Sequence, residues 1–180
     1  MMHPHDDKLL IQRLDSHHLR GKFDCGQADL NRYLQQTAQQ HQKKQVSRSW
    51  VAVRPEDPET ILGFYTTTLA EIPPEHLNSK DAKKLPKANL PVVRLSRLAV
   101  DQNHQGLQIG QRLLVDAIVR TVRLLGEFAV VAMIVDAKDA RASSYYQHFG
   151  FIPLLDDPLK LYLPAQALVE VYASMTDSQV

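Results

Sequence analysis

The stretch Pro91–Leu125, PVVRLSRLAVDQNHQGLQIGQRLLVDAIVRTVRLL, decides the fold. Its first ten residues are rich in apolar and β-branched side chains and predict a strand. After the loop DQNHQG, apolar residues recur at helical spacing, at Ile109, Leu113, Leu114, Ala117 and Ile118. The run AVVAMIV at 129–135 shows no alternation, which is typical of a strand buried on both faces. Strand, helix and strand in this order predict a βαβ unit.

The rest of the chain adds elements on both sides of this unit. We expect an amphipathic helix at 29–41, then a hairpin of two strands, SWVAVR at 49–54 and ILGFYTTTLA at 61–70. Prolines interrupt the segment that follows, which leaves room for one short helix around 75–84. Beyond the second strand of the unit we expect a helix at 138–148, short strands at 151–154 and 159–163, and a last helix from Pro164. The fold class is α/β (α+β), with a mixed β-sheet flanked by helices.

Length and composition set the broad class. A chain of 180 residues is about the size of one domain, so we expect a single domain over 1–180. With 44% hydrophobic residues and no apolar run near the ~20 residues of a membrane span, no membrane insertion is expected. The start MMHPHDDKLL lacks the pattern of a signal peptide, and Cys25 is the single cysteine, so we expect a cytoplasmic protein.

Positive charge gathers in two places. The stretch 80–97 carries six basic residues against Asp81, and a second group follows the first expected helix at Lys43, Lys44 and Arg48. Such groups are compatible with a polyanionic partner, although a solvated, lysine-rich loop is the commoner reason for such a run. Both interpretations remain open from charge alone.

The loop QGLQIG at 105–110 joins a strand end to a helix start, where unpaired backbone N–H groups and the helix dipole favour a phosphate. Gly106 and Gly110 would let a ligand approach the backbone closely. The loop is neither a P-loop, which needs Gly-Lys-Ser/Thr, nor a GxGxxG dinucleotide turn. On these residues alone, a phosphate cradle and a plain structural turn are both possible.

RLAVDQNHQGLQIGQRLL at 97–114 resembles the acetyl-CoA site of the Gcn5-related N-acetyltransferases (GNAT), whose signature is Gln/Arg-x-x-Gly-x-Gly/Ala. Gln105 and Gly110 match, whereas Gln108 stands at the central glycine. The resemblance implies a GNAT-like sheet with a central βαβ acetyl-CoA unit. It implies that the backbone of Leu98, Ala99 and Val100 pairs with the pantetheine arm. It also implies a pyrophosphate cradle made of Gln105, Gly106, Leu107, Gln108, Ile109, Gly110 and Gln111.

Two further blocks are similar to one branch of this family, the acetyltransferase toxins of bacterial toxin–antitoxin pairs. FDCGQADLNRYLQQTA at 23–38 matches their Phe-x-Cys-Gly opening, and VDAKDARASSYYQHFGF at 135–151 matches their tyrosine block, with Tyr145 in place of the usual phenylalanine. This likeness implies that the acceptor is the amino group of an aminoacyl-tRNA. It also implies a ribbon–helix–helix antitoxin as partner and a homodimer.

Acyl transfer to an amine needs a neutral amine and a proton for the departing thiolate. By the resemblance, Tyr146 supplies that proton, since a phenol of pKa ~10 remains protonated at neutral pH. As ordinary helix residues, one of Tyr145 and Tyr146 would instead pack against the core, and the other would lie half exposed. Glu71 is the one candidate general base. An α-amine, of pKa ~7.7–8.0, arrives partly neutral, unlike a lysine amine of pKa ~10.4, and so needs little help from a base.

The tRNA expectation gives the basic residues a role. Their charges would contact RNA phosphates. Arg97, next to Leu98–Val100, is the leading candidate, and its alternative role is an ion pair with a nearby acidic residue. The full set is Arg97, Arg94, Lys83, Lys84, Lys87, Lys43 and Lys44. No metal site is expected, because His3, His5, His17 and His18 lack metal-ligand spacing. The alternative functions are acetylation of small amines or protein N-termini, and a non-catalytic binding module that keeps the GNAT fold.

Overall fold

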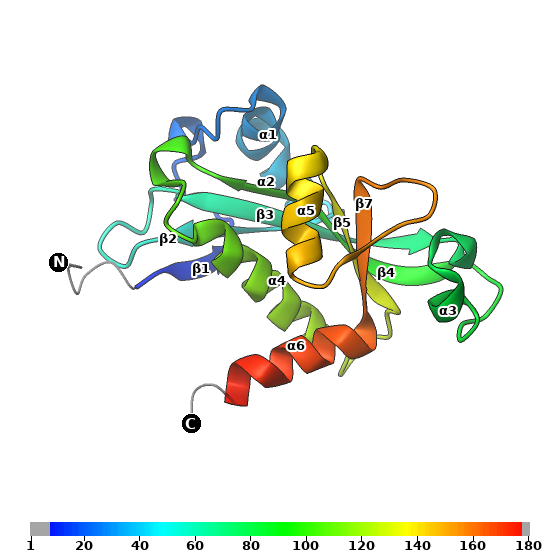
Figure 1. Ribbon diagram of the computed structural model, residues 1–180. Helices are drawn as coiled ribbons and strands as arrows, with labels where there is room; N and C mark the ends of the chain where they lie inside the picture. Colours follow the sequence, from blue (N-terminus) through cyan, green and yellow to red (C-terminus); the bar gives the residue numbers. More distant parts are fainter. Residues whose placement is uncertain (1–7, 178–180) are drawn as a thin grey trace. The chain divides into compact units, whose positions relative to one another are not determined.

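The computed structural model describes residues 8–177 (Figure 1). The helices are α1 (Ala28–Arg32), α2 (Ala38–Lys43), α3 (Ser79–Ala82), α4 (Ile109–Leu124), α5 (Ala140–His148) and α6 (Ala165–Asp177). The strands are β1 (Leu10–Arg13), β2 (Arg48–Val53), β3 (Gly63–Ile72), β4 (Leu90–Val100), β5 (Ala132–Asp136), β6 (Ile152–Pro153) and β7 (Lys160–Pro164).

The seven strands form one sheet in the order β1-β2-β3-β4-β5-β7-β6. Strands β4 and β5 are parallel, with Val92 opposite Ala132, and they enclose α4 in the sequence. The pairs β1–β2, β2–β3, β5–β7 and β6–β7 are antiparallel. The predicted mixed sheet, the hairpin and the βαβ unit are therefore confirmed.

The chain divides into two compact units. The first consists of the chain up to Thr67 together with Arg97–Asp116, and the second of Thr68–Ser96 together with the chain from Ala117 onward. Strands β3 and β4 and helix α4 run through both units, because each contains a unit boundary within its length.

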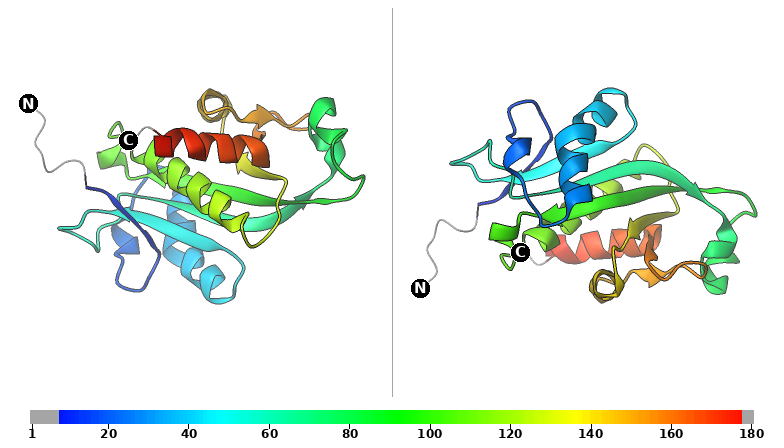
Figure 2. Two further views of the ribbon diagram at one scale, coloured as in Figure 1. Left: turned by 90° about the horizontal axis from the view of Figure 1, so that it is seen from below. Right: turned by 90° about the horizontal axis from the view of Figure 1, so that it is seen from above.

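In the first unit, the sheet is covered on two faces. Figure 2 shows α1 and α2 on one side of β2 and β3, and the start of α4 on the other. The α1–α2 side contains an apolar core to which the helices give Leu34 and Ala38 and the strands give Val51, Phe64 and Ala99. This core confirms the predicted apolar stripe of the first helix.

The second unit has a core of its own. Val92, Ala132, Ile134 and Tyr162 from the strands pack with Leu77 and Leu90. Helix α6 contacts β5 and β7, and α5 contacts β6 and β7. These contacts fix α5, which carries the tyrosine pair, against the last strands.

Two helices differ from expectation. The helix expected at 75–84 is wrong in extent: a 3₁₀ turn spans Pro74–His76, Leu77 is extended, and α3 begins only after Asn78 caps it by accepting the Asp81 N–H. The helix expected at 29–41 is helical throughout, but a π-helical turn, Tyr33–Thr37, separates α1 from α2. A period of 3.6 residues cannot indicate such a turn, since it inserts one residue locally.

Candidate active site

The end of β4 and the start of α4 form the region that resembles a cofactor site. The side chains of Leu98 and Val100 face the helix start: a Cβ at Gly110 would lie 3.6 Å from Val100 Cγ2 and 3.8 Å from Leu98 Cδ2. The first bond of the helix ladder is Arg112 N–H to the Gln108 carbonyl, at 3.1 Å. The N–H groups of the first turn therefore have no acceptor within the helix, and they point outward with the positive end of the dipole.

Two residues of the turn have left-handed backbones. Gly106 has φ +81°, and a side chain there would meet nothing within 4 Å. Gln108 has φ +61°, although left-handed backbone costs a non-glycine residue about 1–2 kcal/mol. Gln108 thus adopts the conformation that suits glycine, the residue that the GNAT signature places at this position. The open backbone at Gly106 and the donors at the helix start fit a pyrophosphate.

Asp101 makes several hydrogen bonds at the start of the loop that joins β4 to α4. Its side chain is buried, with 7% exposure. One carboxylate oxygen accepts the Asp24 N–H at 3.1 Å, and the other accepts the Asn103 N–H at 3.0 Å and lies 3.2 Å from His104 Nδ1. The Asp101 N–H itself donates to the Leu62 carbonyl at 2.8 Å. Asp101 therefore joins its own loop to the segment at Asp24 through its carboxylate and to Leu62 through its backbone N–H.

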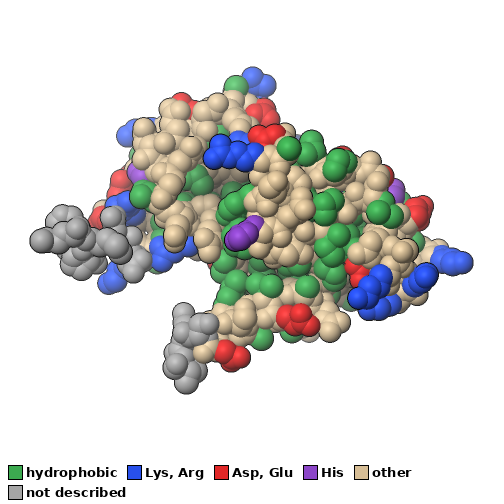
Figure 3. All heavy atoms as spheres, viewed as in Figure 1, with side chains coloured by type: hydrophobic (Ala, Val, Ile, Leu, Met, Phe, Trp, Pro, Cys, Tyr) green, Lys and Arg blue, Asp and Glu red, His purple; other side chains and the backbone are tan. Residues whose placement is uncertain are grey.

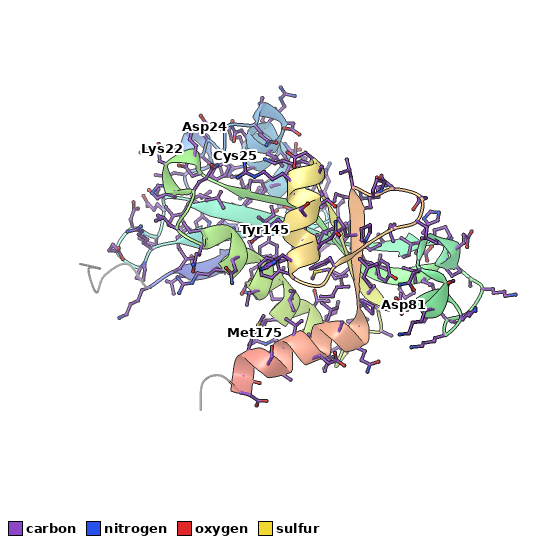
Figure 4. All side chains as sticks on the ribbon, in the orientation of Figure 1. Lys22, Asp24, Cys25, Asp81, Tyr145 and Met175 are labelled. Atoms are coloured by element: carbon purple, nitrogen blue, oxygen red, sulfur yellow. The ribbon has the colours of Figure 1, made fainter. Side chains whose placement is uncertain are left out.

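The FDCG motif at 23–26 also makes hydrogen bonds to the loop that follows β4. The Asp24 carbonyl accepts the Gln102 N–H at 2.8 Å, and its carboxylate accepts the Gln102 amide at 3.1 Å. Asn31 closes the motif on itself by donating to Asp24 at 2.9 Å and accepting the Cys25 N–H at 2.9 Å. Hydrogen bonds from the Gly26 N–H and Asn31 hold the pKa of Asp24 below its usual value. Asp24 and Cys25 are labelled in Figure 4.

Gly63 on β3 allows the helix to start close to the sheet. A Cβ at this position would lie 2.9 Å from Leu113 Cδ1 and 3.0 Å from the Ala99 carbonyl oxygen. Gln105 adds a link between loop and strand, because its amide donates to the Val100 carbonyl at 3.2 Å. That amide, expected to face a phosphate, is thus directed toward the backbone of the cofactor strand.

Tyr146 lies in the second unit, buried on α5 with 7% exposure. Its ring meets Phe151 edge-on at 5.8 Å and Tyr145 at 5.6 Å. Gly150, at φ +94°, ends the helix so that the Phe151 N–H reaches the Tyr146 carbonyl at 3.3 Å. The Phe-Gly-Phe block therefore fixes Tyr146, while Tyr145 remains 40% exposed.

The Tyr146 phenol is kept neutral. Burial, with smaller contributions from Tyr145 and the negative charge of Asp136, raises its pKa well above the usual value. Within residues 8–177 its hydroxyl makes no hydrogen bond. A desolvated phenol of this kind is a proton donor at all physiological pH values and not a base.

The basic residues differ in their surroundings. Arg94 forms an ion pair with Asp136, with Nε and a terminal nitrogen at 2.7 and 2.6 Å from one carboxylate oxygen. Arg97 stacks on Tyr33, its guanidinium carbon 3.6 Å from the ring centroid. The lysines are exposed: Lys43 and Lys44 at the end of α2, and Lys83, Lys84 and Lys87 after α3. Figure 3 shows Lys and Arg side chains gathered around α3 and the loop that follows it.

The residues predicted for the cradle all lie in the first unit, and Tyr146 lies in the second; their functional roles stay predictions. Sequence reasoning missed Asp101, Asp24 and Gly63. The opening motif signalled Asp24 only indirectly, because the matched positions surround it. No group of three or more His, Cys, Asp or Glu suited to a metal occurs in residues 8–177, and His3 and His5 lie outside that range. None of the helices described there is long and apolar enough to cross a membrane.

Comparison with known proteins agrees with this geometry. Residues 45–153 match the family described as acetyltransferase (GNAT) domain. A tRNA-acetylating toxin of Mycobacterium tuberculosis (strain ATCC 25618 / H37Rv) is 33% identical over 150 residues, covering 82% of this chain and 88% of that protein.

Two solved structures are also similar. One is AtaT complexed with acetyl-methionyl-tRNAfMet, with a TM-score of 0.85, 27% identity, and coverage of 92% of this chain and 99% of that one. The other is an AtaT toxin with tyrosine replaced by phenylalanine, bound to the C-terminus of the antitoxin AtaR and acetyl-CoA. Its TM-score is 0.77 at 25% identity, with coverage of 92% and 99%.

Proposed function

The chain belongs to the GNAT acetyltransferase family, and from this premise we propose that it acetylates the α-amino group of an aminoacyl-tRNA with acetyl-CoA and thereby blocks translation. The observation that carries the proposal is the likeness, over nearly the whole chain, to a toxin solved with an acetylated aminoacyl-tRNA. The neutral phenol and the braced anion cradle are what this reaction requires.

The cofactor role of the cradle follows from its donors. Gln105, Gly106, Leu107, Gln108, Ile109, Gly110 and Gln111 would hold the pyrophosphate, and the backbone of Leu98, Ala99 and Val100 would pair with the pantetheine arm. Acetyl-CoA supplies the acetyl thioester. The left-handed turn at Gly106 and Gln108 directs backbone toward the anion, and the first turn of α4 adds its N–H groups.

Tyr146 is the proposed acid. As the amine nitrogen bonds to the acetyl carbon and the C–S bond breaks, the phenol proton moves to the departing sulfur. The raised pKa keeps the phenol protonated before the reaction, so the proton is in place when the thiolate departs. After attack the nitrogen loses one proton to solvent, and a proton from solvent restores the Tyr146 phenol. No strong base is needed beforehand, because an α-amine, of pKa ~7.7–8.0, is already partly neutral.

For the acceptor, we propose that Arg97 and the exposed lysines Lys43, Lys44, Lys83, Lys84 and Lys87 contact tRNA phosphates. Arg94 contributes less, because Asp136 already balances its charge. Binding of this kind weakens as salt rises, since each phosphate contact releases counterions.

The same proposal extends to partners and place of action. We expect one N-acetyltransferase domain, since β3, β4 and α4 run through both units. By the resemblance, it forms a homodimer and is neutralised by a ribbon–helix–helix antitoxin. Aminoacyl-tRNA is made where translation takes place, so the protein would act in the cytoplasm.

Mass spectrometry of charged tRNAs tests the proposal. Total aminoacyl-tRNA is incubated with the protein and acetyl-CoA, and the aminoacyl esters are then released and weighed. One or more amino acids should gain an acetyl group. Acetylation of added small amines or peptide N-termini in place of tRNA would point to the alternative acceptors. Absence of any acetyl transfer and of acetyl-CoA binding would indicate a non-catalytic module.

A further inference from the structure

Two arginines of the first unit lie over aromatic rings, and the two contacts differ in closeness. The Arg97 guanidinium carbon is 3.6 Å from the Tyr33 ring centroid. Arg13 lies over Trp50 at 5.5 Å. A separation of 3.6 Å is van der Waals contact between the guanidinium and the ring, whereas 5.5 Å is near the outer limit of a cation–π contact. The Arg97 contact is therefore the one that fixes a guanidinium in one plane.

Tyr33 lies at the start of the π-helical turn. The turn is closed by the Ala38 N–H donating to the Tyr33 carbonyl, five residues back. Within the turn, the Gln35 carbonyl accepts a hydrogen bond from an Arg20 guanidinium nitrogen at 3.2 Å. π-helical turns are rare and occur often at functional sites. Without the added residue, Tyr33 would have a different helical phase relative to α2.

The ring itself is fixed at its far end. The Tyr33 hydroxyl is 3.1 Å from Ser47 Oγ, and the His41 ring meets it edge-on at 5.8 Å. The side chain is 6% exposed. Tyr33 is thus a rigid surface, and Arg97 rests on it with its long side chain half-buried.

Strand β4 presents Arg97 and the cradle on opposite faces. Side chains alternate along a strand, so Arg97 and Ala99 share one face. Ala99 packs in the α1–α2 core with Tyr33, whereas Leu98 and Val100 lie beside Gly110 at the start of α4. Arg97 therefore lies on the face of β4 opposite the predicted cradle, beside the α1–α2 core.

We propose that Tyr33 is a positioning residue that holds Arg97 as a planar phosphate-binding group for the RNA acceptor. The inference rests on the proposed function and specifies how that acceptor is recognised. Stacking engages the face of the guanidinium, while its N–H donors lie in the plane, where they match phosphate oxygens in a two-pronged arrangement. Preorganisation of this kind lowers the entropy lost when the phosphate binds.

Steady-state kinetics with an acetylatable aminoacyl-tRNA test this proposal. Tyr33→Leu, which keeps apolar bulk but removes the ring, should raise KM for the tRNA about 3- to 30-fold, the range of a cation–π contact. KM for acetyl-CoA should remain within about twofold, and Tyr33→Phe should behave like wild type because the ring remains. Trp50→Leu is the matched control, since it removes the looser stack, and should leave both KM values unchanged within about twofold.

A double mutant separates positioning from packing. Arg97→Ala should raise KM for the tRNA, and Tyr33→Leu added to it should raise KM no further. Arg97→Lys gives a test that does not depend on the core, since it keeps the charge but loses the planar fork, and should raise KM about threefold or more.

Several results would overturn the inference: Tyr33→Leu with wild-type KM, an equal rise of KM for both substrates, full additivity with Arg97→Ala, or Arg97→Lys equal to wild type. If wild-type protein acetylates no charged tRNA, the proposed function fails and this inference falls with it. The wild-type measurement therefore distinguishes the two failures.

Discussion

The cradle loop and the helix that carries Tyr146 are built in opposite ways. Residues 101–105 are fixed by hydrogen bonds: the Asp101 carboxylate accepts the Asp24 and Asn103 N–H groups and lies beside His104 Nδ1, and the Asp101 N–H donates to the Leu62 carbonyl. They lead to a turn whose backbone donors face outward. The Tyr146 side chain packs against neighbouring rings, and within the described chain its buried hydroxyl makes no hydrogen bond. Fixed backbone N–H donors are suited to binding an anion, whereas removal of water from a phenol keeps the phenol protonated at neutral pH.

The largest effect should come from the tyrosine. Tyr146→Phe removes the donor but keeps the ring that packs on Phe151, so acetyl transfer should fall about 10²- to 10⁴-fold with little change in folding. Expression of wild-type protein should arrest bacterial growth, and expression of the variant should not. Tyr145→Phe, its neighbour with 40% exposure, should remain toxic. Growth arrest by Tyr146→Phe equal to that by wild type would exclude the tyrosine mechanism.

The second effect concerns the bracing of the loop. Asp101→Ala leaves the Asp24 and Asn103 N–H groups without their acceptor, so the free energy of unfolding should fall by about 1–3 kcal/mol. Acetyl-CoA affinity should fall about tenfold, the equivalent of ~1.4 kcal/mol, because the cradle loses its fixed start. Calorimetry measures the acetyl-CoA affinity, and thermal unfolding measures the change in stability.

The control for Asp101 is Tyr65→Phe, which removes a 2.7 Å hydrogen bond to Asp116 in the same unit. It should lower stability by about 1 kcal/mol and leave acetyl-CoA affinity intact. Equal loss of affinity in both variants would mean that general destabilisation, not the loop, is responsible.

A third, smaller effect is a dependence of stability on pH. The folded pKa of Tyr146 is raised, so the stability it contributes is fully present below pH ~10, where the unfolded phenol is still neutral, and is lost as pH rises further. The slope is about 1.4 kcal/mol per pH unit above ~10. The difference in unfolding free energy between wild type and Tyr146→Phe should therefore be flat from pH 7 to 9 and shrink toward pH 11.

Tyr162 does not disturb this comparison. Burial and its hydrogen bond to Asp81 raise its pKa to about 12, and it is present in both proteins, so its contribution cancels. An alkaline slope that is identical in the two proteins would show that the Tyr146 phenol is not desolvated.

The smallest effect belongs to Gln108. Gln108→Gly relieves a left-handed backbone worth about 1–2 kcal/mol, partly offset by a gain of chain entropy in the unfolded state. Acetyl-CoA binding should be preserved or slightly tighter. Gln108→Ala keeps the strain and removes the amide, so it separates backbone from side chain. A large loss of affinity in both variants would mean that the Gln108 amide binds the cofactor, whereas a loss in the glycine variant alone would mean that the loop needs a side chain to hold its backbone.

Much of this arrangement follows from local sequence. The apolar residues of 92–100, 109–125 and 129–135 indicate which faces of each strand or helix are buried. Such local patterns are enough to predict the element and its buried side. The cradle was predictable because a strand end followed by a glycine-containing helix start is itself a local feature. Tyr146 required the family resemblance, since two adjacent tyrosines on a helix carry no chemical signal of their own.

The remaining features depend on contacts distant in sequence. Asp24 and Asp101 are 77 positions apart, and no period relates them. Gly63 matters because of Leu113 and Ala99, which reach it only after the sheet has formed. The π-helical turn at Tyr33 likewise depends on tertiary packing, as its five-residue hydrogen bond has no distinctive residue pattern.

The most direct test of the account separates binding from chemistry in one protein. Acetyl-CoA affinity is measured by calorimetry, and a single turnover of acetyl transfer to charged tRNA is followed at saturating acetyl-CoA, for wild type and Tyr146→Phe. We predict equal affinity within about twofold and a transfer rate at least ~100-fold lower in the variant. An unchanged rate, or a loss of affinity that accounts for the whole loss of rate, would contradict the assignment of Tyr146 as the acid.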